Sequence, residues 1–170
     1  MNNNDILRRL RYAFDFSDGE VCAMFSSMDV LVETEQVVRW LKKDDHAEFQ
    51  TLSDETMATF LNGFIISRRG RKDGPLPVPE SKLDNNIVLK KLRIALNYKS
   101  EDMLDVLDLA DQPISEHELS AFFRKKGNKH YRACLDQILR NFLEGLQLTF
   151  RADAPAKQVY ATPTKRQIKE

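Results

Sequence analysis

The residues whose types and spacing could bind a ligand are mainly basic side chains. The densest run combines five Lys and Arg residues with an aromatic ring, in the order Arg124-Lys125-Lys126-Gly127-Asn128-Lys129-His130-Tyr131-Arg132. Cations of this kind can contact successive phosphates while a ring stacks on a base. The run therefore indicates a nucleic-acid site, but an ordinary solvated loop has the same composition, and both interpretations stay open.

Two other basic clusters could extend such a surface. The cluster Arg68-Arg69-Gly70-Arg71-Lys72 lies near the middle of the chain. The other cluster, Lys90-Lys91 with Arg93, echoes Arg8-Arg9 with Arg11. Positions three apart share one face of a helix, so the echoed residues would project together. We expect a nucleic-acid-binding surface made of these residues: Arg71, Lys72, Lys90, Arg93, Arg124, Lys125, Lys126, Lys129, His130 and Arg132.

The repeated polar side chains also have a structural interpretation. An asparagine at the start of a helix can cap it by accepting a hydrogen bond from an orphan backbone N–H. A repeated arginine can pair with a repeated aspartate, and we expect Arg11 to pair with Asp54 and Arg93 with Asp136. On this interpretation the repeated polar side chains stabilise the fold; they are Asn3, Asn4, Arg11, Asp54, Asn85, Asn86, Arg93 and Asp136.

No catalytic or metal-binding constellation is evident in the sequence. His46, His117 and His130 have neither a second histidine four positions away nor a cysteine cluster at metal-ligand spacing. Gly-rich phosphate loops and a GxSxG motif do not occur. Cys22 and Cys134 have apolar neighbours, which favours small buried residues over nucleophiles. We therefore expect a protein that is not an enzyme and uses no metal or cofactor.

These side chains belong to a tandem duplication. Residues from Asn3 onward align with residues from Asn85 onward at a constant offset of 82, without a gap, as far as about residues 70 and 152. The identical pairs include Leu7/Leu89, Leu10/Leu92, Phe60/Phe142 and Gly63/Gly145. Chance similarity would not keep one offset over this distance, so the sequence predicts two copies of one unit of roughly 68 residues.

Each copy is predicted to contain four helices, and the fold class is all-α. In the first copy, apolar residues recur at helical spacing over about residues 4–16, 18–28, 34–43 and 53–67. Asn3 or Asn4, Ser17 or Asp18, and Thr34 are the expected N-caps. In the second copy, helices open at Asn86, Ser100 and Ser115, the last with a capping box. A final helix covers about residues 131–148, either continuously or with a break near Cys134.

The predicted domain organisation is two helical repeats at residues 1–70 and 85–152, a linker at 71–84 and a disordered tail at 153–170. Glycine and alternating prolines end the helix before the linker and favour an extended chain there. The tail lacks a periodic apolar pattern. No segment reads as a signal peptide or a membrane span, and two isolated cysteines suit a reducing compartment, so we expect a cytoplasmic protein without a membrane partner.

Charge is balanced overall but differs between the two copies. The chain carries 26 Lys and Arg against 26 Asp and Glu, which argues against a histone-like nonspecific binder. Residues 3–70 hold 8 basic and 12 acidic side chains, a net charge of −4, whereas residues 85–152 hold 11 and 9, a net charge of +2. We therefore expect the binding surface to be concentrated in the second copy.

Three segments carry a resemblance to a known family. The first is NNDILRRLRYA at residues 3–13, with its echo NNIVLKKLRIAL at residues 85–96. The second is HELSAFFRK at residues 117–125, and the third is NFLEGL at residues 141–146. Over about residues 1–150 the chain resembles the YehS-like bacterial family, known as domain of unknown function 1456. The resemblance implies a duplicated fold and a bacterial, cytoplasmic setting. It implies no activity and no catalytic residue, because none is established for the family.

The leading functional hypothesis is a nonenzymatic binding or regulatory protein whose ligand is RNA or DNA. It depends on the uneven charge and on the repeated Arg/Lys helix. The alternative is a protein–protein interaction adaptor, in which the two units form a groove and an acidic stripe meets a basic partner. The stripe is formed by Asp102, Asp105, Asp108 and Asp111, and its favoured interpretation is a solvated helix face.

Overall fold

The computed structural model describes residues 1–151 and contains eight α-helices and no strand in that part of the chain. The predicted disorder of residues 153–170 lies outside the described residues. Each repeat supplies four helices, which confirms the all-α fold. No helix within residues 1–151 is long and apolar enough to cross a membrane. The helices are α1 (Asn3–Phe14), α2 (Asp18–Ser26), α3 (Thr34–Leu41), α4 (Asp54–Arg69), α5 (Asn85–Leu96), α6 (Ser100–Leu109), α7 (Glu116–Phe122) and α8 (Asp136–Phe150).

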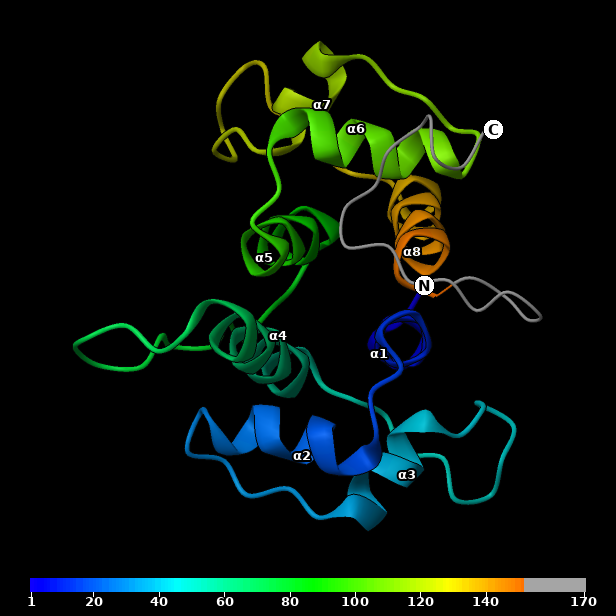
Figure 1. Ribbon diagram of the computed structural model, residues 1–170, viewed down its shortest axis with the longest axis vertical. Coiled ribbons are helices and arrows are strands. Elements are labelled where there is room, and N and C mark those ends of the chain that lie inside the picture. The colour runs from blue at the N-terminus through cyan, green and yellow to red at the C-terminus, as the bar shows by residue number, and fades with distance from the viewer. Residues whose placement is uncertain (152–170) are drawn as a thin grey trace.

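The helices form three layers in which the two repeats are interlocked. Figure 1 shows α1, α4, α5 and α8 in the middle, with α2 and α3 on one side and α6 and α7 on the other. The first helix of each repeat packs mainly on the last helix of the other repeat, α1 on α8 and α5 on α4. Within each repeat, the second helix packs on the last, α2 on α4 and α6 on α8. The two repeats therefore share one core.

The repeated apolar residues form that core. Burial of such side chains is the main favourable contribution to folding, at about 1.5–3 kcal/mol for each large side chain. The repeated pairs that are at most 2% exposed include Leu7/Leu89, Leu10/Leu92, Phe60/Phe142 and Leu61/Leu143. Where the middle helices of the two repeats meet, the ring of Phe14 packs at a tilt against two others, with its centroid 4.7 Å from that of Phe150 and 5.1 Å from that of Phe64.

The repeated Gly63 and Gly145 allow two helices to cross at close range. A Cβ atom on Gly63 would overlap the backbone carbonyl of Met24 in α2, and one on Gly145 would overlap that of Val106 in α6. Met24 and Val106 are themselves 82 positions apart. The same close crossing of the second and last helices therefore occurs in both repeats, and it explains why the two glycines are identical.

Several helix ends match the predictions and others correct them. Ser17 caps α2, and Ser115 with Glu118 forms the predicted capping box of α7. The helix α2 ends at Ser26, before the predicted residue 28, and is followed by Asp29 with a left-handed φ of 59°. Asp111, the equivalent residue after α6, has the same φ. Aspartate tolerates this conformation better than most residues, which accounts for its presence at both positions.

Other boundaries differ because the predicted cap residues lie inside the helices. Thr34 and Ser100 are the first residues of α3 and α6, and their N-cap positions belong to Glu33 and Lys99. The helix α3 ends at Leu41, two residues before the predicted end. The final helix begins at residue 136 and not near 131, because side chains from α5 bind the extended backbone of residues 132–134.

Candidate nucleic-acid interface

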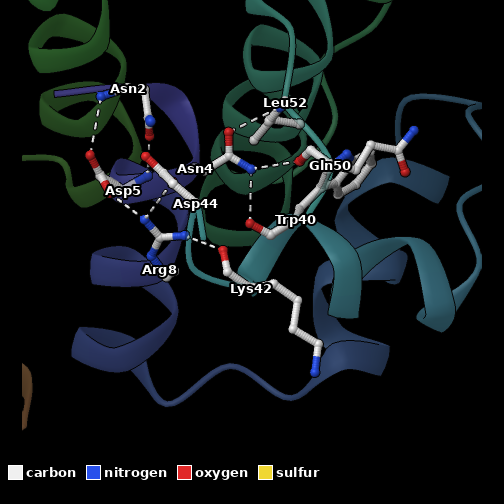
Figure 2. A network of polar contacts seen from close by, with 9 residues as sticks. All are labelled: Asn2, Asn4, Asp5, Arg8, Trp40, Lys42, Asp44, Gln50 and Leu52. Carbon is white, nitrogen blue, oxygen red and sulfur yellow. Dashed lines mark hydrogen bonds and ion pairs between the residues drawn. The ribbon is translucent and has the colours of Figure 1, made fainter. Parts of the chain in front are cut away.

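The side chain of Asn4 organises the chain between α3 and α4. Its Nδ2 donates to the carbonyls of Trp40 and Gln50, both at 2.9 Å, and its Oδ1 accepts from the backbone N–H of Leu52 at 3.0 Å. Figure 2 shows these bonds reaching from α1 to the end of α3, at Trp40, and to the segment before α4, at Gln50 and Leu52. Asn4 is fully buried, so the amide satisfies backbone groups that water does not reach.

The second repeat reproduces this arrangement. Asn86 donates to the carbonyls of Phe122 and Arg132 at 3.0 and 2.9 Å and accepts from the N–H of Cys134 at 2.9 Å. All three partners lie 82 positions after their counterparts in the first repeat. The prediction that Asn3 or Asn4 caps α1 is therefore wrong. Asn2 caps α1 and Asp84 caps α5. The side chains of Asn4 and Asn86 instead bind the segments that precede α4 and α8.

The repeated aspartates join the two repeats and do not pair with the repeated arginines. Asp54 accepts from Asn3 at 2.7 Å and from the backbone N–H of Leu83, which lies just before α5, at 2.9 Å. Asp136 accepts equivalent bonds from Asn85 at 2.7 Å and from the amino group of Met1 at 2.8 Å. Each aspartate thus holds the last helix of its own repeat to the start of the other repeat.

The expected pairs of Arg11 with Asp54 and Arg93 with Asp136 do not form. The Nε of Arg11 lies 3.8 Å from Asp18, at the start of α2. Arg93 donates to the carbonyl of Tyr98 at 3.2 Å and to the hydroxyl of Ser100 at 3.3 Å, and its guanidinium lies 4.7 Å from the ring centroid of Phe123. Both arginines therefore sit at the junction of the first and second helices of their repeats.

A second reciprocal contact involves Arg69 and Arg151, whose equivalence was not among the predictions from the sequence. Arg69 at the end of α4 donates to the carbonyl of Ile94 in α5 at 3.2 Å, and Arg151 donates to the carbonyl of Tyr12 in α1 at 3.0 Å. Both the donors and the acceptors are 82 positions apart, so Arg69 and Arg151 are an identical pair that the alignment of the two copies could have singled out. Together with the aspartate contacts, these bonds relate the repeats by an approximate two-fold symmetry.

The two repeats differ where α1 faces the loop after α3 and where α5 faces the loop after α7. In the first repeat, Arg8 pairs with Asp5, lies 3.9 Å from Asp44 and donates to the carbonyl of Lys42 at 2.6 Å. Figure 2 shows this guanidinium held between the three groups. The two carboxylates neutralise its charge.

The equivalent cation of the second repeat is Lys90, and its surroundings lack both carboxylates. The positions of Asp5 and Asp44 are occupied by Ile87 and Lys126. Lys90 is exposed and takes part in no ion pair within residues 1–151, while Lys126 turns to Asp84 at 3.5 Å. Two substitutions between the repeats have therefore exposed positive charge on α5.

Lys90 lies between two adjoining clefts that also share Arg69 and Ile94. One cleft, of about 600 Å³, runs between α4, the linker and α5, and is lined among others by Arg71 and Lys72. The other, of about 340 Å³, includes Arg93, Tyr98 and Phe123. The larger cleft is also lined by Lys91, which pairs with Glu80. We call the remaining cations of the two clefts the basic face; they are Arg69, Arg71, Lys72, Lys90 and Arg93.

The predicted basic run forms a separate loop next to the basic face. This basic loop, residues 124–132, begins directly after Phe123 at the edge of the smaller cleft. In Figure 1 the loop after α7 and the linker after α4 project toward the same side of the view, with α5 between them. Arg124, Lys125 and Lys129 are exposed and form no ion pair in the described chain.

Two members of the predicted set contribute less to this surface. The Arg132 guanidinium folds back onto the carbonyls of Lys129 and Tyr131, at 3.3 and 2.9 Å. His130 is exposed, and its backbone N–H donates to the side chain of Asn128 at 2.8 Å. The structure thus brings Arg71, Lys72, Lys90 and Arg93 together on the basic face and places the remaining members of the set on the adjoining loop.

Comparison with known proteins shows the same division of the chain. The family described as a protein of unknown function (DUF1456) matches twice, over residues 3–70 and residues 85–152. This chain belongs to the DUF1456 family. It is 40% identical over 147 residues to the uncharacterized protein YehS of Escherichia coli (strain K12), a match that covers 86% of this chain and 94% of that protein. No solved structure matches.

The two cysteines of this DUF1456 chain have raised pKa values. Burial raises the pKa of the Cys134 thiol to about 12, and burial together with Asp18 raises that of Cys22, so both stay protonated near neutral pH. Within residues 1–151, no three His, Cys, Asp or Glu side chains gather closely enough to hold a metal ion. The aspartate stripe on α6 is not a continuous solvated face, because Asp108 is only 8% exposed.

Proposed function

We propose that this DUF1456 protein is a nonenzymatic binding protein whose ligand is RNA or DNA. The observation that carries the proposal is the exposed Lys90, which lacks the two carboxylates that neutralise Arg8 in the first repeat. Lys90 joins two clefts whose other cations come from α4, the linker and α5. Cations placed in a row along a surface can neutralise successive phosphates, and release of counterions then drives binding.

The neighbourhood of the basic face supports a polynucleotide in preference to a single small anion. The basic loop adds Arg124, Lys125 and Lys129 beyond the edge of the smaller cleft. A half-buried aromatic ring, Phe123, lies between the two groups of cations, and its contact with Arg93 provides a flat surface of the kind on which bases stack. A cytoplasmic location, where RNA and DNA are present, is part of the proposal.

The test is salt-dependent binding of a labelled RNA strand, and of DNA of the same sequence, measured by fluorescence anisotropy. The informative variant is Lys90→Gln with Lys125→Gln. Its matched control is Arg9→Gln with Lys43→Gln, which removes two exposed cations from the equivalent elements of the first repeat. We expect the first variant to lower the slope of log affinity against log salt by about 1.4, because each contact with a single strand contributes about 0.7. The control should keep the wild-type slope.

Two results would reject the proposal. One is the absence of binding at low salt by the wild-type protein. The other is an equal loss of affinity in the variant and its control, since net charge alone would then explain binding. A protein partner that remains bound stoichiometrically after nuclease treatment, with no affinity for either strand, would favour the adaptor alternative.

A further inference from the structure

We propose that the cleft between α4, the linker and α5 binds a nucleotide, with the base over Asn62 and the phosphate at the basic face. The inference rests on the proposed function and adds a base-binding site to it. The nucleotide could be free or could be one residue of a strand. These two sources share the same chemistry, and the experiment below separates them.

The floor of this cleft contains a buried donor that lacks an acceptor. Asn62 is 2% exposed, and its Oδ1 accepts from the Nζ of Lys91 at 2.6 Å. That bond fixes which end of the amide is oxygen, and the Nδ2 then has no acceptor within residues 1–151. Because buried donors are nearly always bonded, this amide marks a place where a ligand can supply an acceptor.

An acceptor of the protein lies beside this donor. Lys91 is 13% exposed at its side chain and also lies 3.1 Å from the carboxylate of Glu80, in the linker. Since Asn62 and Glu80 contact the same ammonium group, a donor and an acceptor occupy adjoining positions in the cleft. The edge of a nucleobase also presents hydrogen-bond donors and acceptors side by side, so it can match such a pair.

The walls and rim fit the rest of a nucleotide. The volume of about 600 Å³ lies within the range of small-molecule sites, and Ile65, Ile66, Ile87 and Ile94 supply apolar walls. Arg69, Arg71, Lys72 and Lys90 outnumber the two lining carboxylates, Asp73 and Glu80, the second of which pairs with Lys91. The excess positive charge can bind a phosphate. An anion with an alkyl chain would match these walls and this charge, but it would leave the Asn62 amide buried without an acceptor. A base satisfies all three features.

The approximate symmetry of the fold does not produce a second such site. The positions equivalent to Asn62 and Lys91 are Glu144 and Arg9, and both side chains are exposed. The buried amide and its lysine therefore belong to one side of the molecule. This difference makes Glu144 a matched control position.

The test is NMR spectroscopy of the full chain, titrated separately with nucleoside monophosphates, a short RNA strand and inorganic phosphate. We expect the nucleotides to shift the side-chain amide resonance of Asn62, whereas inorganic phosphate should not. Asn62→Asp keeps an acceptor for Lys91 but removes the free donor, so it should weaken nucleotide binding roughly tenfold, the effect of losing one hydrogen bond. Glu144→Gln should bind as the wild type does.

The outcomes separate this inference from the proposed function. The inference is overturned if the wild type binds RNA strands without a shift of the Asn62 resonance and the Asn62→Asp variant binds them equally well. The proposed function would then still stand. If free nucleotides shift the Asn62 resonance but no strand binds, the result supports the nucleotide site and rejects the proposed function. A shift of Asn62 by inorganic phosphate alone would also overturn the inference. If Asn62→Asp does not fold, Ile94→Glu, at a wall position that is 42% exposed, must weaken nucleotide binding instead.

Discussion

Asp54 at the start of α4 accepts a hydrogen bond from the backbone N–H of Leu83 at 2.9 Å, across the boundary between the repeats. The equivalent Asp136 accepts from the amino group of Met1 at 2.8 Å. Because α1 packs mainly on α8 and α5 on α4, each repeat completes the core of the other. The duplicated unit of the sequence is therefore not the packing unit of the structure.

This interlocking predicts that one repeat alone does not fold. A fragment of residues 1–84 would expose the faces of α1 and α4 that normally contact α8 and α5, and its helical circular dichroism should be far below half that of the full chain. Mixing it with a fragment of residues 83–151 should restore helical signal, because the missing faces are then available. A cooperative thermal transition of the first fragment as a monomer would contradict the prediction.

The repeated glycines give a prediction about helix crossing. Gly63→Ala and Gly145→Ala should each lower the free energy of unfolding by about 1–3 kcal/mol or more, since the added Cβ must push α2 away from α4 or α6 away from α8. Urea denaturation monitored by circular dichroism measures the change. Gly19→Ala is the control, because its Cβ would meet only the Ser17 hydroxyl at 3.8 Å and alanine favours the helix. A stable Gly63→Ala protein would show that this crossing can relax.

The buried asparagines give a matched pair of stability predictions. Asn4→Leu and Asn86→Leu should each lower the free energy of unfolding by about 1.5–4.5 kcal/mol, because each change removes three hydrogen bonds worth about 0.5–1.5 kcal/mol apiece. The measurement is again urea denaturation, with the exposed Gln112→Leu as control. Similar losses at the two positions are expected from the similar geometry. A loss at only one of them would mean that the repeats tolerate the missing bonds differently.

Asp136 makes stability depend on pH. The pKa of this carboxyl is held below its ordinary value mainly by the hydrogen bond from Asn85, and the bond from the Met1 amino group lowers it further. A pKa that is lower in the folded state adds stability above the unfolded pKa of about 3.9, and this stability is lost as pH falls through the folded pKa. The difference in unfolding free energy between the wild type and Asp136→Asn should therefore shrink below about pH 4. Asp45→Asn, at an exposed position in the loop after α3, should show no such trend.

The divergence between Arg8 and Lys90 can be reversed. Ile87→Asp restores a carboxylate at the position equivalent to Asp5 and should neutralise Lys90, which would lower the salt slope for RNA by about 0.7. Ile87→Asn has a similar size without charge and is the control. Equal binding by the two variants would mean that Lys90 does not contact phosphate.

The sequence by itself determined much of the fold through local periodicity and self-comparison. Helical spacing of apolar residues located all eight helices, and the constant offset identified the duplication, because residues with the same role recur 82 positions apart. Helix ends were harder to predict. The start of α8 depends on Asn85 and Asn86, which bind the backbone of residues 132–134 from 46 to 49 positions away in the chain.

Contacts between residues far apart in sequence were decided only by the tertiary structure. Periodicity cannot tell which helices pack together, so the exchange of α1 and α5 between the repeats was not predictable, and the expected pair of Arg11 with Asp54 was wrong. The basic side chains could be read from the sequence. The cleft beside them, with Asn62 on its floor, could not, because its walls come from α4, the linker and α5, and the packing of these segments is not encoded in local periodicity.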